Sequence, residues 1–226
     1  MTLFEIQTIE HKLGYVFKDK NLLISAFTHS SYINENKSVS VPFDYDRLEF
    51  FGDSILQFII TEKLYFRINK DEGEMTTIRA GIVSRKPLAE AIDKLGIFEH
   101  LKMSVGAKKD AQNSVKVVKF KSNLFETVLA AIYIDAGRDL SEPRAFIERN
   151  LKISFENTDY KSALQEYTQK NLGGSLPKYE SAGKEGDEFL ENVYVGGELL
   201  GSGQGNSKKK AQQIAAKQAL EVLRAR

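Results

Sequence analysis

Three acidic residues at helical spacing are the first feature of this sequence that could do chemistry. The segment 44–59 reads DYDRLEFFGDSILQFI, whose apolar periodicity predicts a single helix. At about 100° per residue, Asp46, Glu49 and Asp53 fall within about 60° of one another. The opposite side is predicted to face the core and consists of Leu48, Phe51, Ile55 and Phe58.

Like charges spaced in this way repel each other by a few tenths of a kcal/mol per pair on a helix surface. Only Arg47 is close enough in sequence to offset them, and it lies off their line. A bound cation would remove the repulsion, and oxygen-only ligands favour Mg²⁺ or Mn²⁺ over zinc. A solvated acidic face is the alternative, and the spacing by itself supports both interpretations equally.

The order of residue types in this segment is a second line of evidence. DRLEFFGDS, residues 46–54, closely resembles the signature of the ribonuclease III family, which usually has Glu at the first position and Leu in place of Phe51. The resemblance implies a catalytic metal site with further members in DEGEM and SNLFE. The implied metal ligands are Glu49, Asp53, Asn123 and Glu126, and the implied catalytic residues are Asp53, Glu126, Glu49, Asp46 and Glu72, of which Asp46 and Glu72 lie on the substrate side.

One of these positions departs from the family pattern, because the family normally has Asp where this chain has Asn123. An amide oxygen can coordinate a hard cation, but it brings no negative charge. We therefore expect a raised metal requirement. The alternative is that Asn123 impairs or abolishes cleavage and leaves a double-stranded RNA-binding protein of the same fold.

The resemblance implies Mg²⁺-dependent hydrolysis of double-stranded RNA, with Mn²⁺ as a possible substitute. Metal ions would ionise the attacking water and stabilise the developing charge, so neither a protein nucleophile nor a small-molecule cofactor is expected. The implied products carry 5′-phosphate and 3′-hydroxyl ends. Structured precursors of ribosomal RNA, messenger RNA and other RNAs are the expected substrates.

Phe50 is a large aromatic residue that lies nearer to the acidic side of the predicted helix than to its apolar side. In the family, the matching aromatic inserts into a partner subunit across a two-fold axis, which implies a homodimer. The alternative is that Phe50 packs within its own subunit.

The C-terminal part resembles a double-stranded RNA-binding domain, from DYKSALQEYTQ at 159–169 to GSGQGNSKKKAQQIAA at 201–216. Three lysines at the start of a helix oppose its positive dipole end, unless phosphates dock there. A solvated basic patch is the alternative. The acidic loop 184–188, KEGDE, replaces the family's Gly-Pro-x-His pattern and should weaken one contact. The expected RNA-binding residues are Ser162, Gln165, Glu166, Gln169, Ser207, Lys208, Lys209 and Lys210.

The hydrophobic periodicity predicts an all-α domain at 1–154, a linker at 155–159 and an α+β domain of order α-β-β-β-α at 160–226. The resemblance implies that the first is an endonuclease domain and the second a double-stranded RNA-binding domain. His29 is expected to be a hydrogen-bonded structural histidine at a helix end, and the alternative is a proton-transfer group. Further N-terminal helices are expected at 3–13, 22–27, 87–95, 123–136 and 143–151, with a loop at 33–43, a turn at 69–74 before another helix, and an irregular basic stretch at 103–117. The C-terminal elements are expected at 160–171, 178–181, 189–195, 198–203 and 208–224.

The composition fits this division, since 226 residues with 42% hydrophobic and 28% charged residues can build two domains. The chain has no cysteine, which excludes disulfides and thiolate zinc sites. We expect a cytoplasmic protein without a membrane segment, because no apolar run has spanning length and the N-terminus is amphipathic. The net charge of +1 is uninformative as a total.

Overall fold

The computed structural model describes residues 1–155 and 159–225, and most of the expected linker, residues 156–158, lies outside the described residues. By its spatial contacts the chain divides into two compact units, each considered by itself below. The first unit contains Met1–Asn69 and Ile82–Ser154, and the second contains Lys70–Gly81 and Phe155–Arg226. Within the described residues, no helix is long and apolar enough to cross a membrane.

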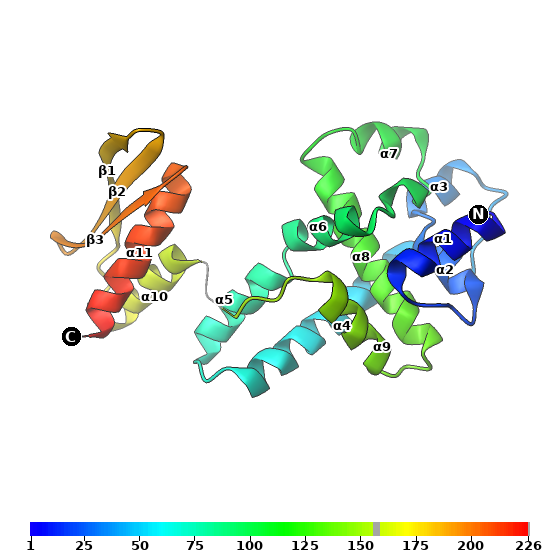
Figure 1. Ribbon diagram of the computed structural model, residues 1–226, viewed down its shortest axis with the longest axis horizontal. Helices are drawn as coiled ribbons and strands as arrows, with labels where there is room; N and C mark the ends of the chain where they lie inside the picture. Colours follow the sequence, from blue (N-terminus) through cyan, green and yellow to red (C-terminus); the bar gives the residue numbers. More distant parts are fainter. Residues whose placement is uncertain (156–158, 226) are drawn as a thin grey trace. The chain divides into compact units, whose positions relative to one another are not determined.

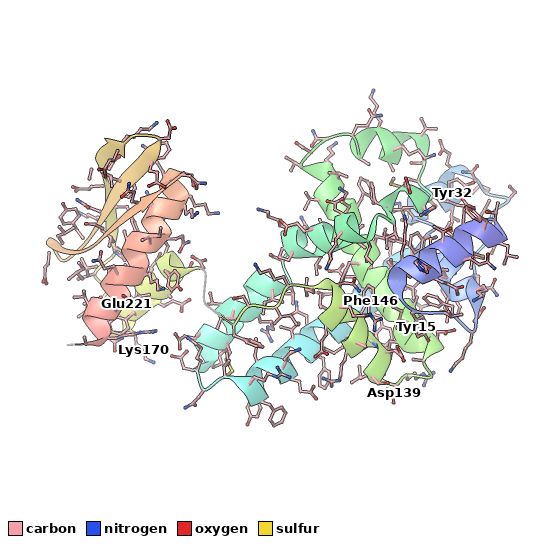
Figure 2. All side chains as sticks on the ribbon, viewed as in Figure 1. Tyr15, Tyr32, Asp139, Phe146, Lys170 and Glu221 are labelled. Carbon is pink, nitrogen blue, oxygen red and sulfur yellow. The ribbon has the colours of Figure 1, made fainter. Side chains whose placement is uncertain are left out.

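The first unit is helical, with one short 3-10 turn, η1 (Phe98–His100) (Figure 1). Its helices are α1 (Leu3–Leu13), α2 (Lys20–Ala26), α3 (Ser30–Glu35), α4 (Tyr45–Arg67), α6 (Arg85–Leu95), α7 (Val105–Asp110), α8 (Lys116–Asp135) and α9 (Ser141–Asn150). Helix α8 runs through the middle of the unit and packs against α2, α4, α6 and α9. It is buried almost all round along 122–132, as the sequence predicts for a central helix. The ring of Phe146 on α9, labelled in Figure 2, packs on Phe125 of α8 with ring centroids 5.2 Å apart.

Local caps explain where the first helices begin and end. Thr2 and Glu5 form a capping box at the start of α1, and Gly14 ends that helix with a positive φ of 65°. His29 is the N-cap of α3, where its Nδ1 accepts from the backbone N–H of Ser31. The prediction of a structural histidine is therefore confirmed. Asp44 caps α4 by accepting from the N–H of Arg47 at 2.9 Å, so the helix begins just after Asp44.

Helix α4 differs from the prediction in its length and in its buried side. It continues to Arg67, well beyond Ile59. Leu48 and Ile55 are buried as expected, but Phe51 and Phe58 are 39% and 51% exposed, so their predicted place in the core is wrong. The buried side is centred instead on Tyr45, Leu48, Gly52, Ile55, Leu56 and Ile59. The half-buried Glu49 and Asp53 consequently border the core instead of lying opposite it.

Three other expectations are corrected by short helices. Helix α3 occupies the start of the predicted loop at 33–43, and α7 occupies part of the stretch predicted to be irregular at 103–117. Helix α5 (Glu72–Ile82) begins inside the predicted turn, with Gly73 and Glu74 already helical. In each case the helix follows a polar residue that caps it, such as Ser104, which accepts from the N–H of Ala107.

The second unit contains most of α5 and an α-β-β-β-α fold. The elements of this fold are α10 (Tyr160–Asn171), β1 (Lys178–Glu185), β2 (Glu188–Val195), β3 (Glu198–Gly205) and α11 (Lys208–Arg224). The strands form an antiparallel sheet in the order β1-β2-β3, and α11 packs along β3 (Figure 1). Its core joins Val193 and Leu200 of the sheet to Leu164 of α10 and the alanines of α11. The predicted order is confirmed.

Two glycines of β3 set the distance between the sheet and α11. A Cβ atom at Gly201 would lie 2.3 Å from the carbonyl oxygen of Ala215, and one at Gly203 would lie 2.2 Å from that of Ala211. The helix therefore rests on the backbone of the strand, which only glycine permits. This packing fixes where the first turn of α11, with its lysines, is presented.

Candidate active site

Acidic residues from α4 and α8 line one pocket of about 390 Å³ in the first unit. The two helices pack against each other, which brings residues some seventy positions apart to the same wall. The lining residues are Asp46, Glu49, Phe50, Asp53, Arg85, Ser122, Asn123 and Glu126. Five of these, namely four carboxylates and Asn123, were predicted from the sequence as members of one site.

Burial and mutual repulsion make the charged form of Glu49 and Glu126 unfavourable. Burial, followed by the charges of Asp53 and Glu49, raises the pKa of Glu126 to about 8. Burial and the charge of Asp46 also raise the pKa of Glu49, against the opposing effect of nearby cations. A site of this kind favours any species that brings positive charge among the acids.

Asn123 is buried, with 8% of its surface exposed, and it lines the same pocket as Glu49. Next to the larger effects of burial, Asp46 and Lys119, its amide lowers the pKa of Glu49, because an amide N–H favours the charged carboxylate. An aspartate at this position would be a fifth carboxyl group in the pocket and, when ionised, would have no N–H to offer Glu49. Asn123 therefore relieves the repulsion inside the pocket while its amide oxygen stays available as a ligand.

The donor types in the pocket fit a hard divalent cation, since they are carboxylate, amide and hydroxyl oxygens with neither sulfur nor imidazole. In the described part of the chain, however, no three His, Cys, Asp or Glu side chains converge closely enough to hold a metal ion together. Ligation therefore requires rotation of these side chains toward the ion. Asp46 accepts from the Ser30 hydroxyl at 3.1 Å, and Asp53 accepts weakly from Gln57 at 3.4 Å. Within residues 1–155 and 159–225, neither carboxylate forms an ion pair.

Two further residues of the pocket are absent from the sequence prediction, and one predicted residue does not line it. Arg85 and Ser122 line the pocket, although no motif pointed to Arg85. Ser122 could have been found as the neighbour of Asn123. Glu72 lies in the first turn of α5 in the second unit, where it accepts from the Thr76 hydroxyl at 3.2 Å. The role expected for Glu72 stays a prediction.

Phe50 is 76% exposed, which argues against the alternative that it packs within its own subunit. It borders both the acid pocket and a larger, mainly apolar hollow of about 790 Å³. That hollow is also lined by Pro42, Phe43, Phe51 and Ile134. Exposed aromatic rings beside an apolar hollow form a surface that a partner of similar shape could cover.

In the second unit, the predicted RNA-binding residues lie on exposed positions of α10 and at the start of α11. Gln165, Glu166 and Gln169 are exposed on one side of α10. Ser207 is the N-cap of α11 and accepts from the N–H of Lys210 at 3.3 Å. Lys208, Lys209 and Lys210 are exposed in a first turn that has no acidic residue.

Ser162 and the loop 184–188, which the sequence places on the RNA-binding surface, make contacts within their own domain. The hydroxyl of Ser162 donates to Asp159, the N-cap of α10, at 2.8 Å. The predicted acidic loop 184–188 is a tight hairpin, in which only Gly186 and Asp187 separate β1 from β2. The ammonium group of Lys184 lies 4.3 Å from the ring centroid of Phe189.

Comparison with known proteins shows which families the domain with the acid pocket and the domain with the α11 lysines resemble. Residues 19–153 match the family model described as "Ribonuclease-III-like", and residues 160–223 match that of the double-stranded RNA binding motif. The chain belongs to the ribonuclease III family. Members of this family are double-strand-specific endoribonucleases that generally depend on divalent metal ions.

Relatives named ribonuclease 3 resemble this family member over nearly its whole length. The protein from Symbiobacterium thermophilum is 38% identical over 92% of this chain and 90% of its own. The protein from Nitratiruptor is also 38% identical, over 98% of both chains. A solved nuclease domain of ribonuclease III from Campylobacter jejuni is 31% identical with a TM-score of 0.53, covering 64% of this chain and 97% of its own. That structure was described for flexibility in a region involved in dimer formation.

Proposed function

We propose that this ribonuclease III is a Mg²⁺-dependent endonuclease that hydrolyses double-stranded RNA to products with 5′-phosphate and 3′-hydroxyl ends. The observation that supports this most is the pocket in which α4 and α8 bring together four carboxylates and Asn123. Oxygen donors of this kind suit Mg²⁺, and Mn²⁺ would substitute because it accepts the same ligands.

Each lining residue receives a role in this proposal. Glu49, Asp53, Glu126 and the amide oxygen of Asn123 would hold the metal. A bound divalent ion would supply an ionised water and charge stabilisation at the phosphate. Asp46, at the edge of the pocket and exposed, would orient the substrate side. Glu72 receives the same substrate-side role from the family resemblance alone.

The second unit would deliver the RNA. A minor groove of A-form RNA presents 2′-hydroxyls to the exposed amides of α10, and the lysines of α11 would contact phosphates across the adjacent groove. Ser162 and Glu166 would complete the α10 contact, and Ser207 would hold the first turn of α11 in place. Recognition would follow the shape of the duplex, with little reading of sequence.

A homodimer completes the proposal, with Phe50 of one subunit entering the apolar hollow of the other. The exposure of Phe50 and the size of the neighbouring hollow support this arrangement. Structured precursors of ribosomal and messenger RNA in the cytoplasm are the substrates and the compartment that we assign.

A second candidate function follows from the neutral amide that Asn123 contributes to the pocket. If four carboxylates and this amide do not retain Mg²⁺, the protein binds double-stranded RNA without cutting it. The two functions make opposite predictions for a single assay.

The test is incubation of long duplex RNA with the full chain in Mg²⁺ and in EDTA. We expect metal-dependent shortening to fragments with 5′-phosphate ends, and loss of shortening in Glu126→Gln. Glu90→Gln, an exposed acid on α6 outside the pocket, serves as the control and should cut normally. Retarded migration of intact RNA in both conditions would refute cleavage and favour the RNA-binding alternative.

A further inference from the structure

Arg85 is a cation built into the wall of the acid pocket. It is the first residue of α6, and its exposed side chain lines the pocket together with the carboxylates of α4 and α8. The position of its backbone is fixed, because α6 packs on α8 through Leu88, Ala89, Ala91 and Ile92. The core of the first unit therefore holds the start of α6 beside the acid cluster.

Despite this position, Arg85 does not form an ion pair within 4.0 Å with any acid of the described residues. Other cations of the same unit are paired, such as Lys63 with Glu148 at 2.6 Å and Lys121 with Asp93 at 2.5 Å. The charge of Arg85 still acts on the pocket, since it lowers the pKa of both Glu49 and Glu126. Arg85 is thus near the carboxylates without being neutralised by one of them.

The start of α6 adds a second observation that points to an anion. The Ser84 side chain is at the N-cap position but makes no capping hydrogen bond to the first turn of this eleven-residue helix. The first turn of α6 places the positive end of the helix dipole beside Arg85. A guanidinium beside a helix N-terminus matches the two non-bridging oxygens of a phosphodiester, which a bidentate Arg contact recognises.

We propose that Arg85 binds the phosphodiester group of the RNA at the acid pocket and stabilises its charge during cleavage, which makes Arg85 a catalytic residue. This inference rests on the proposed nuclease function. An RNA backbone that approaches four carboxylates is repelled by them, and Arg85 supplies an attractive contact at the rim of the same pocket. No acid needs to be released first, because Arg85 is not paired.

Arg85 could instead have a purely electrostatic role, in which it only offsets the acids of the RNA-free protein. In that case its removal should leave the rate of cleavage at saturating metal unchanged. Removing a positive charge next to the acids should strengthen metal binding, by Coulomb's law. If Arg85 contacts the phosphate, its removal should nevertheless slow cleavage at saturating metal. The combination of unweakened metal binding and slower cleavage is therefore diagnostic.

The experiment compares Arg85→Ala and Arg85→Lys with Lys86→Ala in the full chain. Lys86 is the matched control, because it is the adjacent exposed cation, lies 3.9 Å from Glu90 and does not line the pocket. Titration calorimetry with Mn²⁺ on the RNA-free protein measures metal affinity. Single-turnover cleavage of duplex RNA at saturating Mg²⁺ measures the chemical step.

We expect Arg85→Ala to slow cleavage by on the order of 100-fold, with Mn²⁺ affinity equal to or tighter than that of the wild type. Arg85→Lys should recover part of the rate, and Lys86→Ala should match the wild type in both measurements. A wild-type cleavage rate in Arg85→Ala would overturn the proposal, as would a loss that additional metal fully restores. Failure of the wild type to cut at all would instead reject the nuclease function on which the proposal rests.

Discussion

A Cβ atom at Gly52 would lie 1.9 Å from the backbone carbonyl oxygen of Glu126. Helices α4 and α8 therefore touch backbone to backbone at this point, one residue before Asp53 and directly at Glu126. This close approach brings the carboxylates of the two helices to the same pocket. The glycine inside the acidic motif is thus a packing residue that makes the candidate site possible.

Replacing this glycine tests the relationship. Alanine is favoured over glycine in a helix by about 1 kcal/mol, but here the added methyl group must displace the backbone of α8. We expect Gly52→Ala to lower the free energy of unfolding by on the order of 3 kcal/mol and to abolish cleavage. Chemical denaturation measures the first effect. Gly106→Ala in α7 is the control, because a Cβ there has no atom within 4 Å, and equal effects of the two substitutions would contradict this account.

The raised pKa of Glu126 predicts how stability depends on pH. The folded protein keeps this proton up to a pH of about 8, whereas an unfolded glutamate loses it near pH 4.3. Folding therefore takes up a proton between these values, and the metal-free protein should lose stability as pH rises through this window. Glu126→Gln should remove most of this loss and be more stable than the wild type at pH 8. Thermal unfolding in EDTA from pH 4 to 9 checks this, and identical slopes for both proteins would refute it.

Asn123→Asp should act in opposite directions with and without metal. Without metal it adds a fifth, buried carboxyl group to the pocket, which we expect to cost on the order of 2 kcal/mol of stability. With Mg²⁺ the additional charge should tighten binding and lower the metal concentration needed for half-maximal cleavage. Thermal unfolding and cleavage across a Mg²⁺ series measure both effects. Superimposable cleavage curves for the two proteins would remove Asn123 as the cause of a raised metal requirement.

How far the sequence predicts this structure depends on whether the decisive signal is local. Helices 160–171 and 208–224 have the predicted bounds, since Asp159 and Ser207 cap them and an alanine stripe marks the buried side of α11. The apolar pattern places Phe51 and Phe58 on the wrong side of α4, because an apolar residue looks the same in a sequence whether it is buried or exposed. Arg85 was missed for another reason. It reaches the pocket only through the packing of α6 on α8, which no local pattern encodes.

The exposed aromatic residues of α4 predict which substitution separates the subunits. Phe50→Ala should shift the protein from dimer to monomer at low concentration, because it empties the contact proposed for the apolar hollow. Phe66→Ala is a matched control, since Phe66 is on the same helix, is 78% exposed and does not line the hollow. Analytical ultracentrifugation gives the masses. A Phe50→Ala protein that stays dimeric would exclude this contact as the anchor of the dimer.

The three lysines that begin α11 predict a gain in stability together with a loss in RNA binding. Replacing Lys208, Lys209 and Lys210 by Gln removes positive charge from a positive helix end, which should stabilise the free domain slightly. The same change should weaken binding to duplex RNA. It should also reduce the slope of the logarithm of the binding constant against the logarithm of salt concentration by about 1 for each lost phosphate contact. Binding assays over a salt series test this, with Lys217→Gln in the middle of α11 as the control. Weaker binding with an unchanged salt slope would count against phosphate contacts.

The most direct measurement of the central claim is a crystal structure of the full chain grown with Mn²⁺, examined by anomalous scattering. Our account predicts an anomalous peak inside the pocket, with the carboxylates of Glu49, Asp53 and Glu126 turned toward it. An empty pocket at saturating Mn²⁺, with these carboxylates paired to Arg85 instead, would contradict it.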